Sequence, residues 1–160
     1  MNPYYRYRQN TVRDSEVFPN VKYISYHLPK TAGTSFYETL GTAFNKHRIF
    51  RIYTGEAAKE MSKGRAIWVP PHKTIVHGHF RPRPSHAERF PNAQRIVWVR
   101  DPIERLWSYL RHWLTTGEGA KFQTFKKTYM ENRTYALPEL FDLLVRDPFY
   151  KDIVDFYQFT

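Results

Sequence analysis

Three short stretches of the sequence combine side chains that can bind an anion or move a proton. The first runs from Lys30 to Ser35 and joins a lysine, hydroxyl groups and a glycine. The second is His77-Gly78-His79, whose imidazoles have an ordinary pKa of about 6.5 and suit a general base near neutral pH. The third runs from Arg100 to Ser108, and its guanidinium and hydroxyl groups can hold a phosphate. These residue types predict a site that binds a phosphate or sulfate group.

The first stretch lies between a predicted strand over residues 21–26 and a predicted helix over residues 35–46. A helix start leaves backbone N–H groups unpaired and carries a positive dipole, so it can hold an anion. The candidate anion-binding residues are Lys30, Thr31, Ala32, Gly33, Thr34 and Ser35. The pattern also fits an ordinary α/β connection, because Ser35 and Glu38 have the spacing of a helix capping box.

This loop does not fit a nucleoside-triphosphate P-loop. That motif needs a glycine, four further residues and then Gly-Lys-Ser/Thr. Lys30 precedes Gly33 instead of following it, and no glycine stands five residues before Gly33. No predicted strand ends in a carboxylate placed to hold Mg²⁺. The loop therefore favours a phosphate-bearing donor that is bound without a metal.

The elements that would position these stretches alternate between strand and helix. Further strands are predicted over residues 48–53, 73–77 and 95–99, and further helices over residues 55–63, 101–114, 120–131 and 138–146. Residues 95–99 are apolar enough to predict a central strand buried on both faces. The predicted fold class is α/β, in three layers with helices on both faces of a short parallel sheet. Ligands bind at the carboxyl edge of such a sheet, so the three stretches are expected to face one cleft.

Length and composition predict one domain over residues 1–160, with an extended arm over residues 1–20. The chain has no cysteine, which excludes disulfides and thiolate chemistry and fits a reducing compartment. No apolar run approaches the ~20 residues that cross a bilayer, and the N-terminus lacks the apolar core of a signal peptide. We therefore expect a cytoplasmic protein with no membrane segment.

The formal net charge of +10 calls for an anionic partner. Nucleic acid, an acidic glycan and a polyphosphorylated small molecule would all satisfy it. The sequence shows no basic helix stripe and no Cys/His finger spacing, so no nucleic acid is expected as a partner.

Residues Pro29-Lys30-Thr31-Ala32-Gly33-Thr34-Ser35, His77-Gly78-His79 and Arg100-Asp101-Pro102-Ile103-Glu104-Arg105-Leu106-Trp107-Ser108-Tyr109 carry a family resemblance. With them the chain resembles sulfotransferases that use 3′-phosphoadenosine 5′-phosphosulfate (PAPS). Within that family it is most similar to the glycan 2-O-sulfotransferases of the heparan sulfate and uronyl type. The resemblance covers residues 21–115 and implies a P-loop-like sulfotransferase fold. The family has a longer C-terminal portion, so the chain is expected to be a minimal or a truncated member.

The resemblance implies a role for each stretch. Residues 30–35 would grip the 5′-phosphosulfate of PAPS, and Lys30 would also stabilise charge on the leaving oxygen. Arg100 and Ser108 would hold the 3′-phosphate. His79, with His77 beside it, would lie at the acceptor hydroxyl and act as the base. The expected acceptor is a glycan or another carbohydrate.

Several assignments have alternatives. Arg81, Arg83 and His86 form a more weakly supported set that would attract an acidic acceptor. His-x-His is also a metal-ligand spacing, but with no third ligand nearby no metal is expected. One of the two histidines can instead be a packed residue, and His79 is preferred as the base. Arg100 can pair with Asp101 or Glu104.

Two tryptophans and one charged run are interpreted as structural. Two other functions of the chain remain open. Trp107 and Trp113 are interpreted as core residues, and the charged run from Lys121 to Lys127 as a solvated face. The alternative functions are a nucleotide or sugar kinase with a degenerate phosphate loop, and a basic nucleic-acid-binding domain.

Overall fold

A computed structural model describes residues 16–65, 67–116 and 120–150 of the chain. The chain divides into two compact units, Met1–Val99 and Arg100–Thr160. Their positions relative to one another are not determined, so each unit is described by itself and the single domain stays a prediction. Most of the predicted N-terminal arm lies outside the described residues. Its last part is anchored, because Phe18 is buried and stacks on Phe90 with ring centroids 5.6 Å apart.

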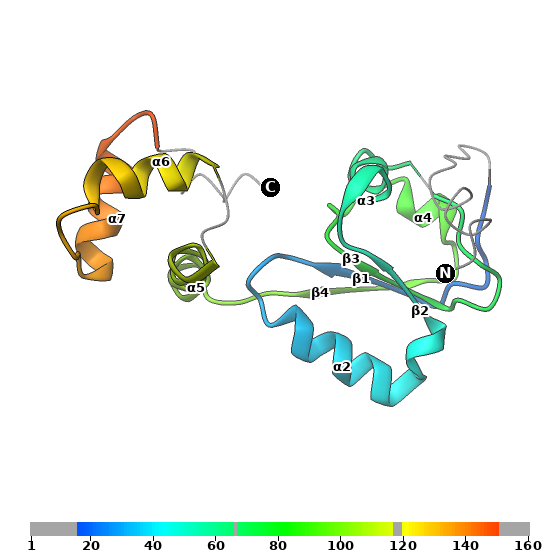
Figure 1. Cartoon of the computed structure of the whole chain (residues 1–160). Helices are drawn as coiled ribbons and strands as arrows, with labels where there is room; N and C mark the ends of the chain where they lie inside the picture. The colour runs from blue at the N-terminus through cyan, green and yellow to red at the C-terminus, as the bar shows by residue number, and fades with distance from the viewer. Residues whose placement is uncertain (1–15, 66, 117–119, 151–160) are drawn as a thin grey trace. The chain divides into compact units, whose positions relative to one another are not determined.

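Unit 1 is built on a four-stranded parallel sheet, as predicted for the α/β class (Figure 1). Its elements are β1 (Tyr23–His27), α2 (Gly33–Phe44), η1 (Lys46–Arg48), β2 (Ile49–Ile52), α3 (Gly55–Ser62), β3 (Ile75–Gly78), α4 (His86–Arg89) and β4 (Gln94–Trp98). The strand order is β2-β3-β1-β4. Figure 1 shows α2 on one face of the sheet and α3 with α4 on the other.

The side chains of each strand alternate between the two faces of this sheet. Successive side chains of a strand point to opposite faces, so every second residue contacts the same helix layer. Ile24, Phe50 and Val76 belong to one buried cluster with Met61 of α3. Their neighbours Ile49 and Ile75 belong to a separate cluster with Leu40 of α2. The sheet therefore has a core on each face, and the helices cover both.

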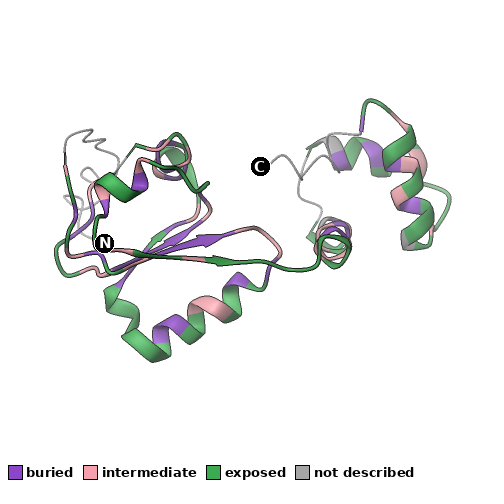
Figure 2. Ribbon diagram, turned by 180° about the vertical axis from the view of Figure 1, so that it is seen from behind, coloured by how far each residue is buried: buried purple, intermediate pink, exposed green. Residues whose placement is uncertain are grey.

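Strand β4 is not the buried central strand that its apolar sequence predicted. Among the described strands it pairs with β1 alone, while β1 and β3 occupy the centre. Val97 and Trp98 are 47% and 48% exposed. Figure 2 shows the contrast between exposed β4 and its buried neighbours. The prediction was wrong because apolar content alone does not fix strand order, which depends on crossover connections.

Unit 2 consists of α5 (Pro102–Thr116), α6 (Ala120–Tyr129) and α7 (Leu137–Arg146), close to the predicted helices. Asp101 caps α5, because its Oδ1 accepts a hydrogen bond from the Glu104 N–H at 3.0 Å. Trp107 packs edge-to-face on Phe141 with centroids 5.9 Å apart, which confirms its core assignment. The side chains of Trp113 and Lys121 lie outside the described part of the chain.

None of the helices in the described residues combines the length and the apolar character that crossing a membrane requires.

Candidate active site

The α2 face of the sheet carries a group of polar side chains toward the carboxyl ends of the strands. At the first level, Ile75 of β3 pairs with Tyr23 of β1 and Ile49 of β2, and all three pack near Leu40. The residues two positions further along each strand face the same way. The third level lies at the last residue of β1 and directly after the ends of β2 and β3. We call these second- and third-level residues the polar layer: Ser25, His27, Arg51, Tyr53, His77 and His79.

His77 lies at the centre of the polar layer and is fully buried. Its Nδ1 lies 2.9 Å from Ser25 Oγ, and its Nε2 lies 2.7 Å from the Tyr53 hydroxyl. Burial, helped by the nearby His27 and Arg51, lowers the pKa of His77 to about 4, so it is neutral at neutral pH. Both ring nitrogens are engaged within the layer. His77 thus matches the packed histidine that the sequence left open as an alternative, and its role beside the acceptor stays a prediction.

His79 lies directly after β3 and pairs with His27. Its Nε2 lies 3.1 Å from His27 Nδ1, and the ring centroids are 4.5 Å apart. Burial lowers the pKa of His79, and burial together with His79 lowers the pKa of His27 to about 4. His79 is only partly buried, and within the described residues its Nδ1 makes no hydrogen bond. His79 is thus a neutral imidazole, and in the tautomer with its proton on Nε2 its Nδ1 can take a proton, as a general base requires.

The loop between β1 and α2 has an unusual backbone. Lys30 and Ala32 have φ values of 66° and 61°, in the left-handed region that residues other than glycine rarely adopt. Left-handed Ala32 is followed by helical Gly33, and such a pair of residues is a backbone arrangement whose N–H groups can bind an anion. Thr31 is buried and its hydroxyl donates to the Leu28 carbonyl at 2.7 Å. The Thr31 hydroxyl therefore closes the loop and is not the free donor that was expected.

The first turn of α2 supplies further donors. The first hydrogen bond from the helix back to the loop runs from the Phe36 N–H to the Ala32 carbonyl, at 3.0 Å. The N–H groups of Gly33, Thr34 and Ser35 come before this point and have no acceptor within the helix. The side chains of Thr34 and Ser35 are exposed, and Lys30 is partly exposed. These residues, together with the left-handed loop, form what we call the anion loop, residues 30–35.

Gly33 brings the anion loop into contact with the polar layer. A Cβ atom added at Gly33 would lie 1.7 Å from His27 Nε2, so only glycine leaves room for this imidazole. His27 is 9% exposed, and its Nε2 is buried without a hydrogen-bond partner among the residues described. His27 therefore contacts the anion loop through one nitrogen and the candidate base through the other.

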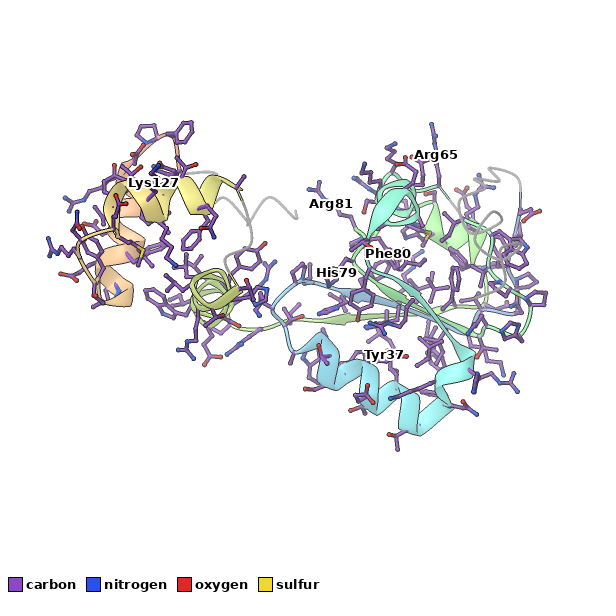
Figure 3. All side chains as sticks on the ribbon, viewed as in Figure 1. Tyr37, Arg65, His79, Phe80, Arg81 and Lys127 are labelled. Carbon is purple, nitrogen blue, oxygen red and sulfur yellow. The ribbon has the colours of Figure 1, made fainter. Side chains whose placement is uncertain are left out.

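Aromatic rings and a cation border the polar layer. Phe36 of α2 stacks on Trp98 of β4 with centroids 5.1 Å apart. Tyr37 stacks on His77 with centroids 6.0 Å apart, and Figure 3 shows Tyr37 between α2 and the sheet. The Arg51 guanidinium lies 4.3 Å from the centre of the Tyr37 ring and 4.8 Å from that of Tyr53. Arg51 thus places a positive charge within the layer.

The basic loop after β3, residues 81–86, carries the residues that were predicted to attract an acidic acceptor. Arg81 and Arg83 are exposed, so a role in attracting an acidic acceptor stays a prediction. His86 is fully buried on the opposite face of the sheet. Its Nε2 donates to the Met61 carbonyl at 2.9 Å, and its Nδ1 lies 3.0 Å from the Tyr26 hydroxyl. The prediction of His86 as an acceptor-binding residue was wrong, because both of its nitrogens are satisfied in the core.

Arg100 and Ser108 belong to unit 2. Arg100 Nε lies 3.1 Å from Glu104 Oε2 in an exposed pair, one of the two alternatives that the sequence left open. Ser108 is partly buried on α5. Their distance from the anion loop is not determined, so their assignment to a 3′-phosphate stays a prediction.

The structure also adds residues to the site that the sequence did not indicate as functional: Ser25, His27, Arg51 and Tyr53. The signal that could have found them is the period-2 alternation, which places each of them on the same face as His77 and His79. In the described ranges, no three or more His, Cys, Asp or Glu side chains are grouped to hold a metal ion.

Comparisons of the chain with models of protein families, with curated proteins and with solved structures found no match.

Proposed function

We propose that the chain is a sulfotransferase that moves the sulfuryl group of PAPS to a hydroxyl group of a carbohydrate. One observation carries the proposal: the anion loop and His79 follow two neighbouring parallel strands, β1 and β3, and His27 joins them. The anion loop and the imidazole of His79 therefore follow the same edge of one sheet, which supports the proposal. A transfer from an anionic donor to a hydroxyl needs this pairing.

The reaction would be an in-line displacement at sulfur. His79 Nδ1 takes the proton of the acceptor hydroxyl while the hydroxyl oxygen forms a bond to sulfur. The bond between sulfur and the bridging phosphate oxygen breaks, and 3′-phosphoadenosine 5′-phosphate (PAP) leaves. Lys30 and the N–H groups of the anion loop face the negative charge that develops on the leaving oxygen. The transition state would thus be stabilised without a metal ion.

The finer parts of the proposal rest on the sequence. The sheet with helices on both faces is compatible with a P-loop-like sulfotransferase fold. Arg100 and Ser108 as ligands of the 3′-phosphate, the carbohydrate nature of the acceptor and the cytoplasmic location come from the resemblance and the composition.

Two measurements test the proposal. Calorimetry compares the binding of PAP, of ATP with Mg²⁺ and of duplex DNA, and we expect binding of PAP alone. Selective binding of ATP with Mg²⁺ would favour the kinase alternative, and selective binding of DNA the nucleic-acid alternative. Transfer of radiolabelled sulfate from PAPS to a panel of neutral and acidic oligosaccharides then tests the reaction itself.

The variants separate binding from catalysis. His79→Ala should reduce transfer by roughly 10²–10⁴-fold, the usual contribution of a general base, and should leave PAP binding intact. Lys30→Ala should weaken PAP binding as well. Val76→Ala is the control, because Val76 is buried on the opposite face of β3 and lies in neither group. Near-normal transfer by His79→Ala would exclude His79 as the base.

A further inference from the structure

The contact between His27 and His79 allows two arrangements of protons. A neutral imidazole carries one N–H and one acceptor nitrogen, and the 3.1 Å contact between His27 Nδ1 and His79 Nε2 holds a single proton. If His27 donates, the remaining proton of His79 lies on its Nδ1, and His79 has no free nitrogen for the acceptor. If His79 donates, its Nδ1 is free, and the remaining proton of His27 lies on Nε2.

The surroundings of His27 Nε2 decide between these arrangements. This nitrogen is buried, lies against Gly33 and has no hydrogen-bond partner in the part of the chain that the structure describes. The unpaired backbone groups at the start of α2 are N–H donors, which cannot accept a hydrogen bond from His27. An empty anion loop therefore disfavours a proton on Nε2. An anion in the loop reverses the preference, because its oxygens accept from Nε2–H and from the backbone together.

We propose that His27 is a positioning residue that couples occupancy of the anion loop to the protonation pattern of His79. The bound anion accepts a hydrogen bond from His27 Nε2–H, which leaves His27 Nδ1 as an acceptor for His79 Nε2–H. His79 Nδ1 is then unprotonated and faces the acceptor. The base becomes ready only when the donor is bound. This inference rests on the proposed function for the identity of the anion and the reaction.

The test is NMR spectroscopy of the histidine rings in ¹⁵N-labelled protein, which distinguishes an Nδ1–H from an Nε2–H ring. Spectra are recorded without ligand, with PAP and with inorganic sulfate, and His27→Phe and His79→Phe assign the signals. On anion binding we expect His27 and His79 both to become Nε2–H tautomers. The amide signals of residues 30–35 report binding independently.

Each outcome has a defined meaning. If PAP binds and His27 keeps its proton on Nδ1, the coupling is overturned while the proposed function stands. If sulfate shifts both tautomers but PAP does not bind, the coupling stands and the proposed function fails. If neither anion binds, both fail.

Kinetics supply a second readout. His27→Phe should lower kcat by at least roughly tenfold, because the base loses its orienting partner. The control Val76→Ala should leave kcat within a few-fold, although it also removes buried atoms. Equal effects of the two variants on kcat would show that His27 acts only through stability, and would overturn the coupling.

Discussion

Acidification should destabilise the fold through the buried histidines of the polar layer. The pKa of His27 and that of His77 are both lowered from 6.5 to about 4, mainly by burial. His79 and Arg51 face these rings and add to the effect. Between pH 6.5 and pH 4 the unfolded chain therefore binds more protons than the folded chain. The stability is fully present above pH 6.5 and is lost as the pH falls toward 4.

The magnitude follows from the two pKa values. A single histidine that titrates at 6.5 when unfolded and at about 4 when folded costs about 3 kcal/mol of stability between pH 7 and pH 4. The losses from His27 and His77 do not add in full, because the nearby His27 contributes to the lowered pKa of His77. A small domain has only about 5–15 kcal/mol in total, so even one such histidine has a large effect.

The assay is urea unfolding at pH 7, 6, 5 and 4, followed by circular dichroism and by fluorescence, for wild type and for His27→Phe. The difference in free energy of unfolding between the two proteins should shrink by about 3 kcal/mol from pH 7 to pH 4. For the control Val76→Ala, which removes no titrating group, the difference should stay constant. A wild-type minus His27→Phe difference that is independent of pH would refute the reasoning.

Two further substitutions test the local geometry. Gly33→Ala would place a methyl group 1.7 Å from His27 Nε2, so the imidazole must move. We expect the free energy of unfolding, measured in urea, to fall by about 1–3 kcal/mol. An unchanged free energy of unfolding would contradict the contact. Asp101→Ala removes the side chain that accepts a hydrogen bond from the Glu104 N–H. Thermal unfolding should show that the free energy of unfolding falls by about 1 kcal/mol. Asp101→Asn should retain most of the stability, because its side-chain oxygen can still accept the hydrogen bond.

Local patterns in the sequence were sufficient to predict most elements. Asp101 is a residue type that commonly caps a helix start, and Gly64, just after α3, has the positive φ of 89° that is common at a helix end. The loop with a lysine before α2 was also predicted, although its left-handed residues were not. These features depend on neighbours within a few positions, which the sequence shows directly.

Features that depend on distant partners could not be predicted. His86 follows a loop with two prolines and was expected at the surface, but Tyr26, sixty positions away, contacts it in the core. The edge position of β4 likewise depends on strand order, which periodicity does not reveal. His27 was visible as a residue, but its importance requires knowing that β1 lies beside β3. Chain order alone would have placed β2 next to β1.

The glycine between the two histidines explains how one short motif gives them different roles. A Cβ atom added at Gly78 would lie 1.7 Å from the Ile52 carbonyl oxygen, so the close pairing of β2 with β3 requires glycine here. The His79 N–H then donates to that same carbonyl at 2.8 Å, which fixes the register at the strand end. In this register His77 is enclosed within the sheet and His79 emerges at its edge. A shift by one residue would turn both imidazoles to the opposite face. The close contact at Gly78 therefore fixes the register in which His77 is buried and His79 is partly exposed.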